Sequence, residues 1–422
     1  MPARPSAGTG MRITFVYRLF SGFEDSFRSG FWKPTGVPTV YRLMEACEEK
    51  GIDCEFIFTA KDDHLVRDFP AAATLALDGL KTPVHIIPSA NCGKGLWGKA
   101  RRALMEVRQA FQVYKRIRSS NPDLVYIGNA NLLLAGFLAR FTNFKTLFRV
   151  MGIYPVMRTA LESKSLVLRA MAWLYRSPFT AALGTQDGSG FPAWASKALR
   201  PGVQVAYLLN GVDNPDPAQS LPPSLPPGLA QKTVVLFVGK LTDMKGAQEF
   251  ADGFLKAFKD CPDGLFAIMV GTGPLKEPIQ RAVVDAGADH AFALIDRLPH
   301  DQILAVQSLA DIYVSLNKQG NLSNANLEAY RSGRCVIIPS SQPDIGVDAD
   351  TDELLGPDTA VRIPDAGDID ALAEAITRLH RNPSERLSRM EAMQKVSETL
   401  PGWDDRMARE LDLLQSIAGV QR

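Results

Sequence analysis

Short apolar runs alternate along the chain with longer stretches in which apolar residues recur every three or four positions. Runs of the first kind are typical of buried strands and stretches of the second kind of amphipathic helices, so their alternation predicts parallel α/β sheets. Seven strand-like runs lie before residue 210: RITFVY, CEFIF, KTPVHIIP, DLVYIG, KTLFRVMG, FTAALG and VQVAYLL. Six more lie after residue 231: TVVLFVG, LFAIMVG, AFALI, IYVSL, RCVIIP and AVRIP.

A proline-dense segment separates the two sets of strands. Residues 214–231, NPDPAQSLPPSLPPGLAQ, contain six prolines and no helical or strand period, which is typical of a linker or a surface loop. The chain after residue 366 is strongly helical, with a break at Pro401–Gly402–Trp403. The pattern therefore predicts two α/β domains, and a length of 422 residues is sufficient for two hydrophobic cores.

Charge is distributed unequally between these two parts of the chain. Residues 1–210 hold 27 Lys and Arg against 15 Asp and Glu, a balance of +12, whereas the remaining residues hold 20 against 31, a balance of −11. An asymmetry of this kind indicates that the first part meets something anionic. The alternative is a bipolar surface without a partner.

Composition and cysteine spacing indicate a globular protein of a reducing compartment. Hydrophobic residues make up 46% and charged residues 22% of the chain, as in soluble domains. The five cysteines form no CxxC pair, and Cys335 lies inside an apolar run where a buried thiol is expected. The longest apolar run of the first half, LLLAGFLA at 132–139, is too short to cross a bilayer. We therefore expect a cytoplasmic protein without a membrane span.

Two lysines follow the first strand of the second domain. In VVLFVGKLTDMKG the strand ends at Gly239 and Lys240, and Lys245 lies in the turn before a long helix. Open α/β sheets bind ligands at the carboxyl ends of their strands, where an ammonium group can neutralise the charge that develops on a leaving diphosphate. Two solvated surface lysines would give the same spacing.

The next strand ends in IMVGTGP, in which Gly271 and Gly273 would let a phosphate group approach the backbone. The dinucleotide fingerprint GxGxxG would require glycine at position 276, which is Lys276. A plain turn is therefore an equal alternative for these glycines. A dehydrogenase that transfers hydride is disfavoured.

An Asn- and Ser-rich loop separates two apolar runs in IYVSLNKQGNLSNANLEAYRSGRCVIIP. Its backbone amides precede a helix start, where they can bind phosphate. Glu328 lies one turn inside that helix, where a carboxylate can accept hydrogen bonds from the hydroxyls of a ribose. The combination predicts a nucleotide site that requires neither a metal nor a nucleophile. The structural alternative is a helix cap with a surface glutamate.

Other catalytic patterns are weak. The five histidines form no HExxH or HxH, and the chain contains no GxSxG. Asp348 and Asp350 form a DxD, which serves metal-dependent nucleotide binding elsewhere, but they lie in the acidic stretch DIGVDADTDE. We expect that stretch to be a solvated loop.

Several of these segments, in this order and at this spacing, resemble retaining glycosyltransferase family 4, which belongs to glycosyltransferase group 1. LLNGVD resembles that family's PNGVD, LFVGKLTDMKG its FVGRL…KG and IMVGTGP its IVGxGP. NANLEAYRSGRCVIIP resembles LEAMAxGxPVI, and TGVPTVYRLMEACEEKGID resembles the glycine loop and helix after the first strand. The resemblance covers nearly the whole chain.

This resemblance implies the GT-B fold, an α/β architecture in which two Rossmann-like domains face each other across a cleft and the last helix crosses back to the first domain. Residues 1–209, with 402–422 returning to them, would bind the acceptor. Residues 210–401 would bind the nucleotide-sugar donor.

The resemblance also implies the residues of the site. Lys240 and Lys245 would act as the catalytic groups on the donor diphosphate, and Glu328 would bind the ribose. Further donor contacts would come from Gly36, Gly239, Gly271, Asn321, Leu322, Ser323 and Asn324. The backbone amides of Leu322, Ser323 and Asn324 would face phosphate. No metal and no cofactor would be needed beside the nucleoside-diphosphate sugar.

Two positions depart from the family pattern. The first glutamate of the family's pair, which touches the donor sugar, falls at Gly320, and the histidine of the first domain falls at Met151. In a retaining front-face reaction the leaving phosphate can take the acceptor's proton, so transfer is still expected. The alternatives are a non-catalytic subunit that binds nucleotide or glycan, and a nucleotide-sugar epimerase, which would require acidic residues and histidines that are scarce here.

Residues 93–120 form a basic stretch, GKGLWGKARRALMEVRQAFQVYKRIRSS. It contains eight cationic residues and a single carboxylate, that of Glu106. Its apolar residues recur at helical spacing, and residues 157–179 repeat the mixture. Such helices suit anionic membrane surfaces, although many simply pack their apolar face on a core. We expect a peripheral membrane enzyme of cell-surface polysaccharide synthesis with a glycan or lipid-linked acceptor. Nucleic acid is not expected, because no recognition motif is present.

Overall fold

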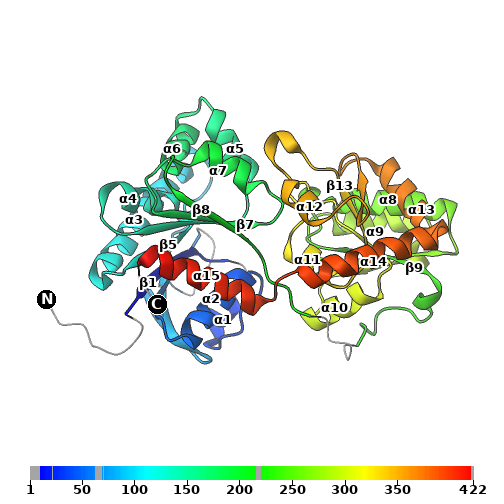
Figure 1. The fold of residues 1–422 in the computed structure, drawn as a ribbon, viewed down its shortest axis with the longest axis horizontal. Helices are drawn as coiled ribbons and strands as arrows, with labels where there is room; N and C mark the ends of the chain where they lie inside the picture. Colours follow the sequence, from blue (N-terminus) through cyan, green and yellow to red (C-terminus); the bar gives the residue numbers. More distant parts are fainter. Residues whose placement is uncertain (1–9, 21, 62–68, 70, 215–219, 420–422) are drawn as a thin grey trace. The chain divides into compact units, whose positions relative to one another are not determined.

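The computed structural model describes residues 10–20, 22–61, 69, 71–214 and 220–419. Two compact units share the chain, as Figure 1 shows. The first unit consists of Met1–Thr185, Trp194–Leu208 and Asp404–Arg422, and the second of Gln186–Ala193 and Leu209–Trp403. Residues 215–219 of the expected proline-rich linker lie outside the described residues.

One segment falls on the other side of the expected domain limits. Residues 186–193, expected in the first domain, group with the second unit. The reason is close backbone packing, because a Cβ at Gly188 would overlap the backbone of Asn321, and one at Gly190 would overlap that of Gly346. The amide of Asp348 also donates to the carbonyl of Gly188 at 2.7 Å.

An eight-stranded sheet forms the first unit, in the order β3-β4-β2-β1-β5-β6-β7-β8. Its strands are β1 (Arg12–Arg18), β2 (Asp53–Thr59), β3 (Ala73–Leu77), β4 (Leu80–Ile87), β5 (Leu124–Gly128), β6 (Thr146–Val150), β7 (Ala181–Gln186) and β8 (Gln204–Leu209). All seven predicted strands of this half are present. The eighth, β3, was not predicted, because it is a short, half-exposed edge strand that pairs antiparallel with β4.

Helices cover both faces of this sheet. They are α1 (Glu24–Ser29), α2 (Pro38–Glu49), α3 (Gly95–Ser120), α4 (Leu132–Phe141), α5 (Pro155–Glu162), α6 (Leu166–Tyr175), α7 (Phe191–Ala198) and α15 (Trp403–Ala418), with a short 3-10 turn η1 (Asn129–Asn131). The crossovers β1–α2–β2 and β5–α4–β6 run in opposite directions along the sheet, and right-handed crossovers therefore place α2 and α4 on opposite faces. Helix α4 packs between α3 and α6.

A buried polar cluster attaches α15 to the first sheet. The hydroxyl of Tyr126 on β5 donates to Glu410 at 2.6 Å, and Arg406 donates to the same carboxylate at 2.6 Å. Burial opposes ionisation of Glu410, but the guanidinium groups of Arg406 and Arg149 outweigh it and hold the pKa of Glu410 below its usual value. The last helix is therefore an integral part of the first unit.

The second unit is a six-stranded sheet in the order β11-β10-β9-β12-β13-β14, in which every neighbouring pair of strands is parallel as predicted. Its strands are β9 (Thr233–Val238), β10 (Leu265–Val270), β11 (Phe292–Ile295), β12 (Ile312–Val314), β13 (Cys335–Pro339) and β14 (Ala360–Ile363). Cys335 is buried and free, as expected for this strand. The strand order reverses between β9 and β12, which is the position at which open α/β sheets bind ligands.

Two hydrophobic cores fill the faces of this second sheet. Along β9, Val235 and Phe237 belong to one core and Val234 and Leu236 to the other, as the two-residue period of a strand requires. The first core is covered by α8 (Ala247–Asp260), α9 (Lys276–Asp285) and α13 (Ile369–Arg381), and the second by α10 (His300–Leu309), α11 (Asn324–Arg331) and α14 (Pro383–Thr399). The remaining elements are α12 (Ala349–Leu354) and the 3-10 turns η2 (Leu229–Gln231), η3 (Asp243–Lys245), η4 (Asp289–Ala291) and η5 (Pro343–Ile345).

No helix in the described part of the chain combines the length and the apolar character that a membrane crossing requires.

Candidate functional site

The carboxyl ends of β9, β10 and β12 bring most of the predicted donor-binding residues to one edge of the second sheet. Lys240 follows β9 directly, and Lys245 ends the turn η3. Burial lowers the pKa of Lys245, Asp187 opposes this effect and Lys240 adds to it. The two lysines and Asp187 therefore lie within electrostatic reach of one another.

Glycines pack the first two of these loops together. A Cβ at Gly271 would overlap the carbonyl oxygen of Gly239, and one at Gly273 would overlap that of Leu241. The amide of Leu241 donates to the carbonyl of Thr272 at 3.0 Å. This close approach is a sufficient structural reason for glycine at positions 271 and 273. The donor contacts expected of Gly239 and Gly271 stay a prediction.

The loop between β12 and α11 is held by a buried side chain. Asn321 is fully buried and donates from its backbone N and its Nδ2 to the carboxylate of Asp348, both at 2.6 Å. Its Oδ1 accepts from Ser315 at 2.7 Å, and its carbonyl accepts from the Tyr330 hydroxyl at 2.6 Å. Because its polar atoms are occupied by the protein, Asn321 shapes the loop and does not present its side chain to a ligand, contrary to the expected donor contact.

The expectation that Asp348 and Asp350 lie in a solvated loop is wrong. Their exposed fractions are 1% and 6%. Asp348 has a left-handed backbone, with φ of 59°, which turns its carboxylate toward Asn321, and it also accepts from Thr351 at 2.6 Å. Burial raises the pKa of Asp348 and raises that of Asp350 to about 6. Twenty-seven residues separate Asn321 from Asp348, so no local pattern reveals their pairing.

Two of the three predicted phosphate-facing amides are available. The amide of Leu322 donates to the carbonyl of Asp187 at 3.2 Å and is therefore occupied in this conformation. Ser323 is the N-cap of α11, and within the described residues the amides of Ser323 and Asn324 have no hydrogen-bond acceptor. These two amides lie at the positive end of the helix dipole.

Glu328 lies in a shielded setting rather than on the surface. Only 16% of its side chain is exposed. His300 Nδ1 lies 3.9 Å from its carboxylate, and His300 Nε2 lies 3.7 Å from Asp213. Burial raises the pKa of Glu328 to about 7, which His300 opposes and Asp213 reinforces. His300 and Asp213 were not predicted as site residues, although Asp213 lies in LLNGVD and His300 in RLPHDQILAVQSLADIYVSL, which resembles the family segment that leads into the donor loop.

The departure at Gly320 has a structural cause. Gly320 has φ of 125°, and a Cβ there would overlap the backbone of Gly188 and Ser189. The family's glutamate at this position could not be accommodated by this path of the loop. The path of this loop therefore requires glycine at position 320.

Gly36 belongs to the first unit, whereas the other predicted donor residues belong to the second. It is exposed and precedes α2 with φ of 95°. Its expected approach to the donor stays a prediction.

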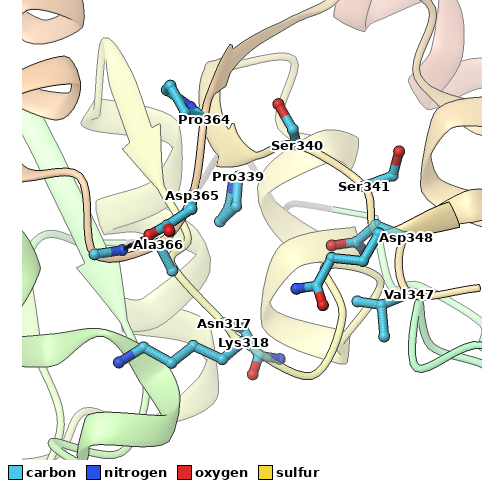
Figure 2. Close-up of a pocket in the computed structure, with 12 residues that line it drawn as sticks. Asn317, Lys318, Pro339, Ser340, Ser341, Val347, Asp348, Pro364, Asp365 and Ala366 are labelled. Carbon is cyan, nitrogen blue, oxygen red and sulfur yellow. Dashed lines mark hydrogen bonds between the residues drawn. The ribbon is translucent and has the colours of Figure 1, made fainter. Parts of the chain in front are cut away.

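A cavity of about 510 Å³ lies beside the loop, at the carboxyl ends of β12, β13 and β14. Figure 2 shows Ser340 and Ser341 on one side of this hollow and Lys318 on the other. Lys318 is paired with Glu249 at 2.6 Å. None of Lys240, Lys245 and Glu328 lines the cavity, so it is adjacent to the predicted donor site and separate from it.

The second unit matches a known family. Residues 232–382 match the model of "Glycosyl transferases group 1". The chain is 26% identical over 245 residues to the GDP-mannose-dependent alpha-(1-6)-phosphatidylinositol monomannoside mannosyltransferase of Mycolicibacterium smegmatis, which covers 55% of this chain and 58% of that protein. The chain spans less than two thirds of the length of the curated relatives it matches.

Solved structures resemble the whole chain. Sucrose-phosphate synthase from Thermosynechococcus elongatus has a TM-score of 0.67 at 15% identity, with 97% of this chain and 100% of that chain covered. Anabaena HepE in complex with UDP has a TM-score of 0.64 at 13% identity, with 96% and 100% covered. At such identities the likeness is one of fold. The chain has the GT-B fold, and its residues 232–382 match the glycosyl transferases group 1 family.

Proposed function

We propose that the protein is a glycosyltransferase that moves a sugar from a nucleoside-diphosphate sugar to a hydroxyl of a glycan or lipid-linked acceptor. The observation that carries this proposal is the grouping of Lys240, Lys245, two available amides and Glu328 at the ligand-binding edge of the second sheet. That edge lies within the segment that matches the glycosyltransferase family. The relative from Mycolicibacterium smegmatis is named a mannosyltransferase, and the HepE structure contains UDP.

Each group has a separate task on the donor. Lys240 and Lys245 neutralise the negative charge that grows on the diphosphate as its bond to the sugar breaks. The amides of Ser323 and Asn324 bind a phosphate oxygen at the start of α11. Glu328 accepts hydrogen bonds from the ribose hydroxyls. Because these groups stabilise the leaving diphosphate without a metal ion, no metal and no cofactor enters the proposed reaction.

The proposed reaction retains the configuration of the sugar. The acceptor oxygen forms its bond to the anomeric carbon on the face from which the diphosphate leaves, and the acceptor proton passes to the leaving phosphate oxygen. The donor phosphate thereby replaces a protein base, and Met151 in the place of the family histidine is compatible with turnover. The protein contributes positioning and charge stabilisation.

The first unit offers a place for the acceptor. A cavity of about 540 Å³ lies at the carboxyl ends of β1 and β5, where the strand order of this sheet reverses. Lys61 and Lys94 line it together with Glu106. Arg18, which is almost fully buried, holds the Glu106 carboxylate with 2.6 Å contacts to both oxygens. A fixed carboxylate beside cationic groups suits an acceptor that presents hydroxyls together with an anionic group.

The outer face of α3 supports a location at a membrane surface. Its apolar residues are 54–83% exposed and do not pack on the core, and we call them the α3 apolar face: Leu96, Trp97, Leu104, Val107 and Phe111. Cationic side chains of Lys99, Arg101 and Arg108 are exposed on the same helix. Apolar and cationic groups on one helix bind anionic lipid surfaces. We therefore propose a peripheral membrane enzyme of cell-surface polysaccharide synthesis, which would place it near lipid-linked acceptors.

A ligand screen tests the donor site directly. Nucleoside-diphosphate sugars are added to the full chain, and thermal unfolding is followed for wild type, Lys245→Ala and Glu328→Ala. A donor at about 100 times its dissociation constant adds about 2.7 kcal/mol to the free energy of unfolding. Wild type should gain this stability and both variants should lose most of the gain. Lys259→Ala and Glu374→Ala, which remove exposed charges of the same unit, should respond as wild type does.

A transfer assay after the donor screen distinguishes the enzyme from the alternative, a non-catalytic subunit. A subunit that only binds nucleotide would be stabilised by the donor and would release no nucleoside diphosphate when glycan acceptors are added. Release of nucleoside diphosphate together with a glycosylated product would establish transfer. Absence of stabilisation by every donor would overturn the proposal.

A further inference from the structure

Three titratable side chains from separate segments meet beside α11. His300 is the first residue of α10, Glu328 lies in α11 and Asp213 follows β8 in the second unit. The two ring nitrogens of His300 face different carboxylates, Nδ1 that of Glu328 at 3.9 Å and Nε2 that of Asp213 at 3.7 Å. The imidazole therefore bridges the two acids.

The backbone around these residues fixes the arrangement. The amide of Val212 donates to the carbonyl of Pro401 at 3.0 Å, and a Cβ at Gly211 would overlap the backbone of Trp403. These contacts hold the chain immediately before Asp213. Helix α10 is tied to α11 by Gln307, which is fully buried and donates to the carbonyl of Ala325 at 3.0 Å. The chain before Asp213 is therefore held against residues 401–403, and α10, which carries His300, is held against α11, which carries Glu328, in both cases independently of charge.

We infer that His300 is a positioning residue for Glu328, and that Asp213 holds the imidazole in place for this task. A protonated imidazole orients the Glu328 carboxylate and keeps it ionised, so that the carboxylate accepts hydrogen bonds from both hydroxyls of the nucleotide's ribose. This inference rests on the proposed function of the donor site. It adds two residues, Asp213 and His300, to which the resemblance to the family assigned no role.

Electrostatics explains why Glu328 needs such a partner. Burial raises the pKa of Glu328 to about 7, Asp213 raises it as well, and His300 and a hydrogen bond from Gln307 lower it. Tyr313 also lies within electrostatic reach of Glu328, and it stays protonated because burial and the charge of Glu328 both raise its pKa. A protonated carboxyl is a poor acceptor for two hydroxyls. Nucleotide affinity should therefore fall as the pH drops below about 7, and it should fall sooner without His300.

Calorimetric titration of the full chain with UDP, GDP and ADP between about pH 6 and pH 8.5 tests this inference, since one pKa unit corresponds to a tenfold change. Near the lower limit, His300→Gln should bind the accepted nucleotide about tenfold more weakly than wild type. Near the upper limit the two should agree within about twofold, because Glu328 is then ionised in both. His300→Lys, which retains a cation, should restore binding at low pH. His290→Gln, an exposed histidine before β11, is the matched control.

The outcomes separate this inference from the proposed function. Equal weakening of His300→Gln at every pH would indicate only a structural role and overturn the inference, as would an unchanged pH profile, while the nucleotide site itself would stand. Absence of nucleotide binding by wild type would overturn both this inference and the proposed function.

A measurement without nucleotide adds an independent test. The NMR titration midpoint of His300 should fall in Glu328→Gln and in Asp213→Asn, because each substitution removes a carboxylate that stabilises the imidazolium. Midpoints equal to wild type would overturn the bridge.

Discussion

Two regions of this chain reverse the usual division between buried and exposed residues, and they do so in opposite directions. In the second unit, the loop before α11 buries polar side chains, with Asn321 at 0% and Asp348 at 1% exposure. In the first unit, α3 exposes apolar side chains, with Leu96 and Trp97 both at 83%. Folding free energy alone favours neither arrangement, because burial of polar groups and exposure of apolar surface are both costly.

The way in which each region offsets this cost indicates its task. The polar groups of the loop satisfy one another, so that the loop is rigid and the amides before α11 are aimed at a fixed point. The α3 apolar face stays exposed in the part of the chain that the structure describes, and a large exposed apolar area on a protein surface marks a site of interaction. A preorganised loop suits recognition of a small ligand, whereas an open apolar and cationic face suits an extended surface.

Removal of the carboxylate at the centre of the loop should have the largest effect. Asp348→Ala leaves the backbone N of Asn321 and the hydroxyl of Thr351 without their acceptor, and it leaves Nδ2 of Asn321 with only its longer bond of 3.3 Å to the carbonyl of Asn317. Each buried unsatisfied group costs about 1–3 kcal/mol, so the free energy of unfolding of the second unit should fall by about 4 kcal/mol. Urea denaturation followed by circular dichroism measures this change. Asp358→Ala, an exposed acid of the same unit, should change it by less than about 0.5 kcal/mol.

A loss below about 1 kcal/mol for Asp348→Ala would contradict the rigid-loop interpretation, because ordinary surface substitutions cause changes of this size. Hydrogen exchange locates the effect. Protection of the amides in residues 315–331 should fall in Asp348→Ala, and the exchange of β1 in the first unit should stay as in wild type.

A methyl group at Gly271 tests whether the glycine loop is a packing feature. In Gly271→Ala the Cβ overlaps the carbonyl of Gly239, so one of the two loops must move, at a cost of about 3 kcal/mol in the free energy of unfolding. Gly356→Ala is the matched control, because its Cβ would enter open space. Thermal unfolding of both variants without ligand gives the comparison. Equal stability of the two would show that packing does not require Gly271 and would favour the donor contact as its reason.

Asp350 is a buried acid that lacks a full set of hydrogen-bond partners, and we expect its replacement to stabilise the protein. Asp350 Oδ2 has no hydrogen-bond partner within the described residues, and burial raises the pKa of Asp350 to about 6. Since the native pKa lies above the unfolded value of about 3.9, stability is lost as the pH rises through this range. Asp350→Asn should therefore increase the free energy of unfolding by about 2–3 kcal/mol above pH 6 and leave it unchanged below about pH 4.

Chemical denaturation of wild type and Asp350→Asn across this pH range measures the difference, with Asp358→Asn as the exposed control. A stabilisation that persists at the acid end would have a cause other than ionisation. No stabilisation near neutral pH would mean that Asp350 finds a partner in solution.

The strands of both sheets could be predicted from sequence because burial on both faces produces apolar runs such as TVVLFV, whatever their neighbours. The edge strand β3 could not, since only one of its residues, Leu77, is buried and its pairing with β4 depends on the turn between them. The positions of Lys240, Lys245 and Glu328 at the ligand-binding edge follow from motif order. Their surroundings do not follow from it.

What the sequence could not supply were contacts between distant segments. Asp348 reaches Asn321 across 27 residues, and His300 bridges Asp213 and Glu328 from three separate segments. An acidic stretch is usually solvated, and here tertiary packing overrides that tendency. The exposure of the α3 apolar face is a similar case, because a helical period shows which residues share a face but not whether a core covers it.

Because the α3 apolar face is exposed, its removal should have the smallest effect on the free energy of unfolding and a separate effect on the binding of lipid vesicles. The double variant Leu96→Ala/Trp97→Ala removes side chains that are 83% exposed, so its free energy of unfolding should stay within about 0.5 kcal/mol of wild type. Its affinity for vesicles of phosphatidylglycerol and phosphatidylcholine should fall at least about tenfold, because burial of one large apolar side chain contributes about 1.5–3 kcal/mol. Leu387→Ala, which removes an exposed leucine of α14, should bind vesicles as wild type does.

Salt should weaken the binding of wild type to these vesicles, because screening shortens the reach of the charges of Lys99, Arg101 and Arg108. If the double variant sediments with vesicles as wild type does, the α3 apolar face is not the membrane contact, and its exposure calls for a protein partner instead.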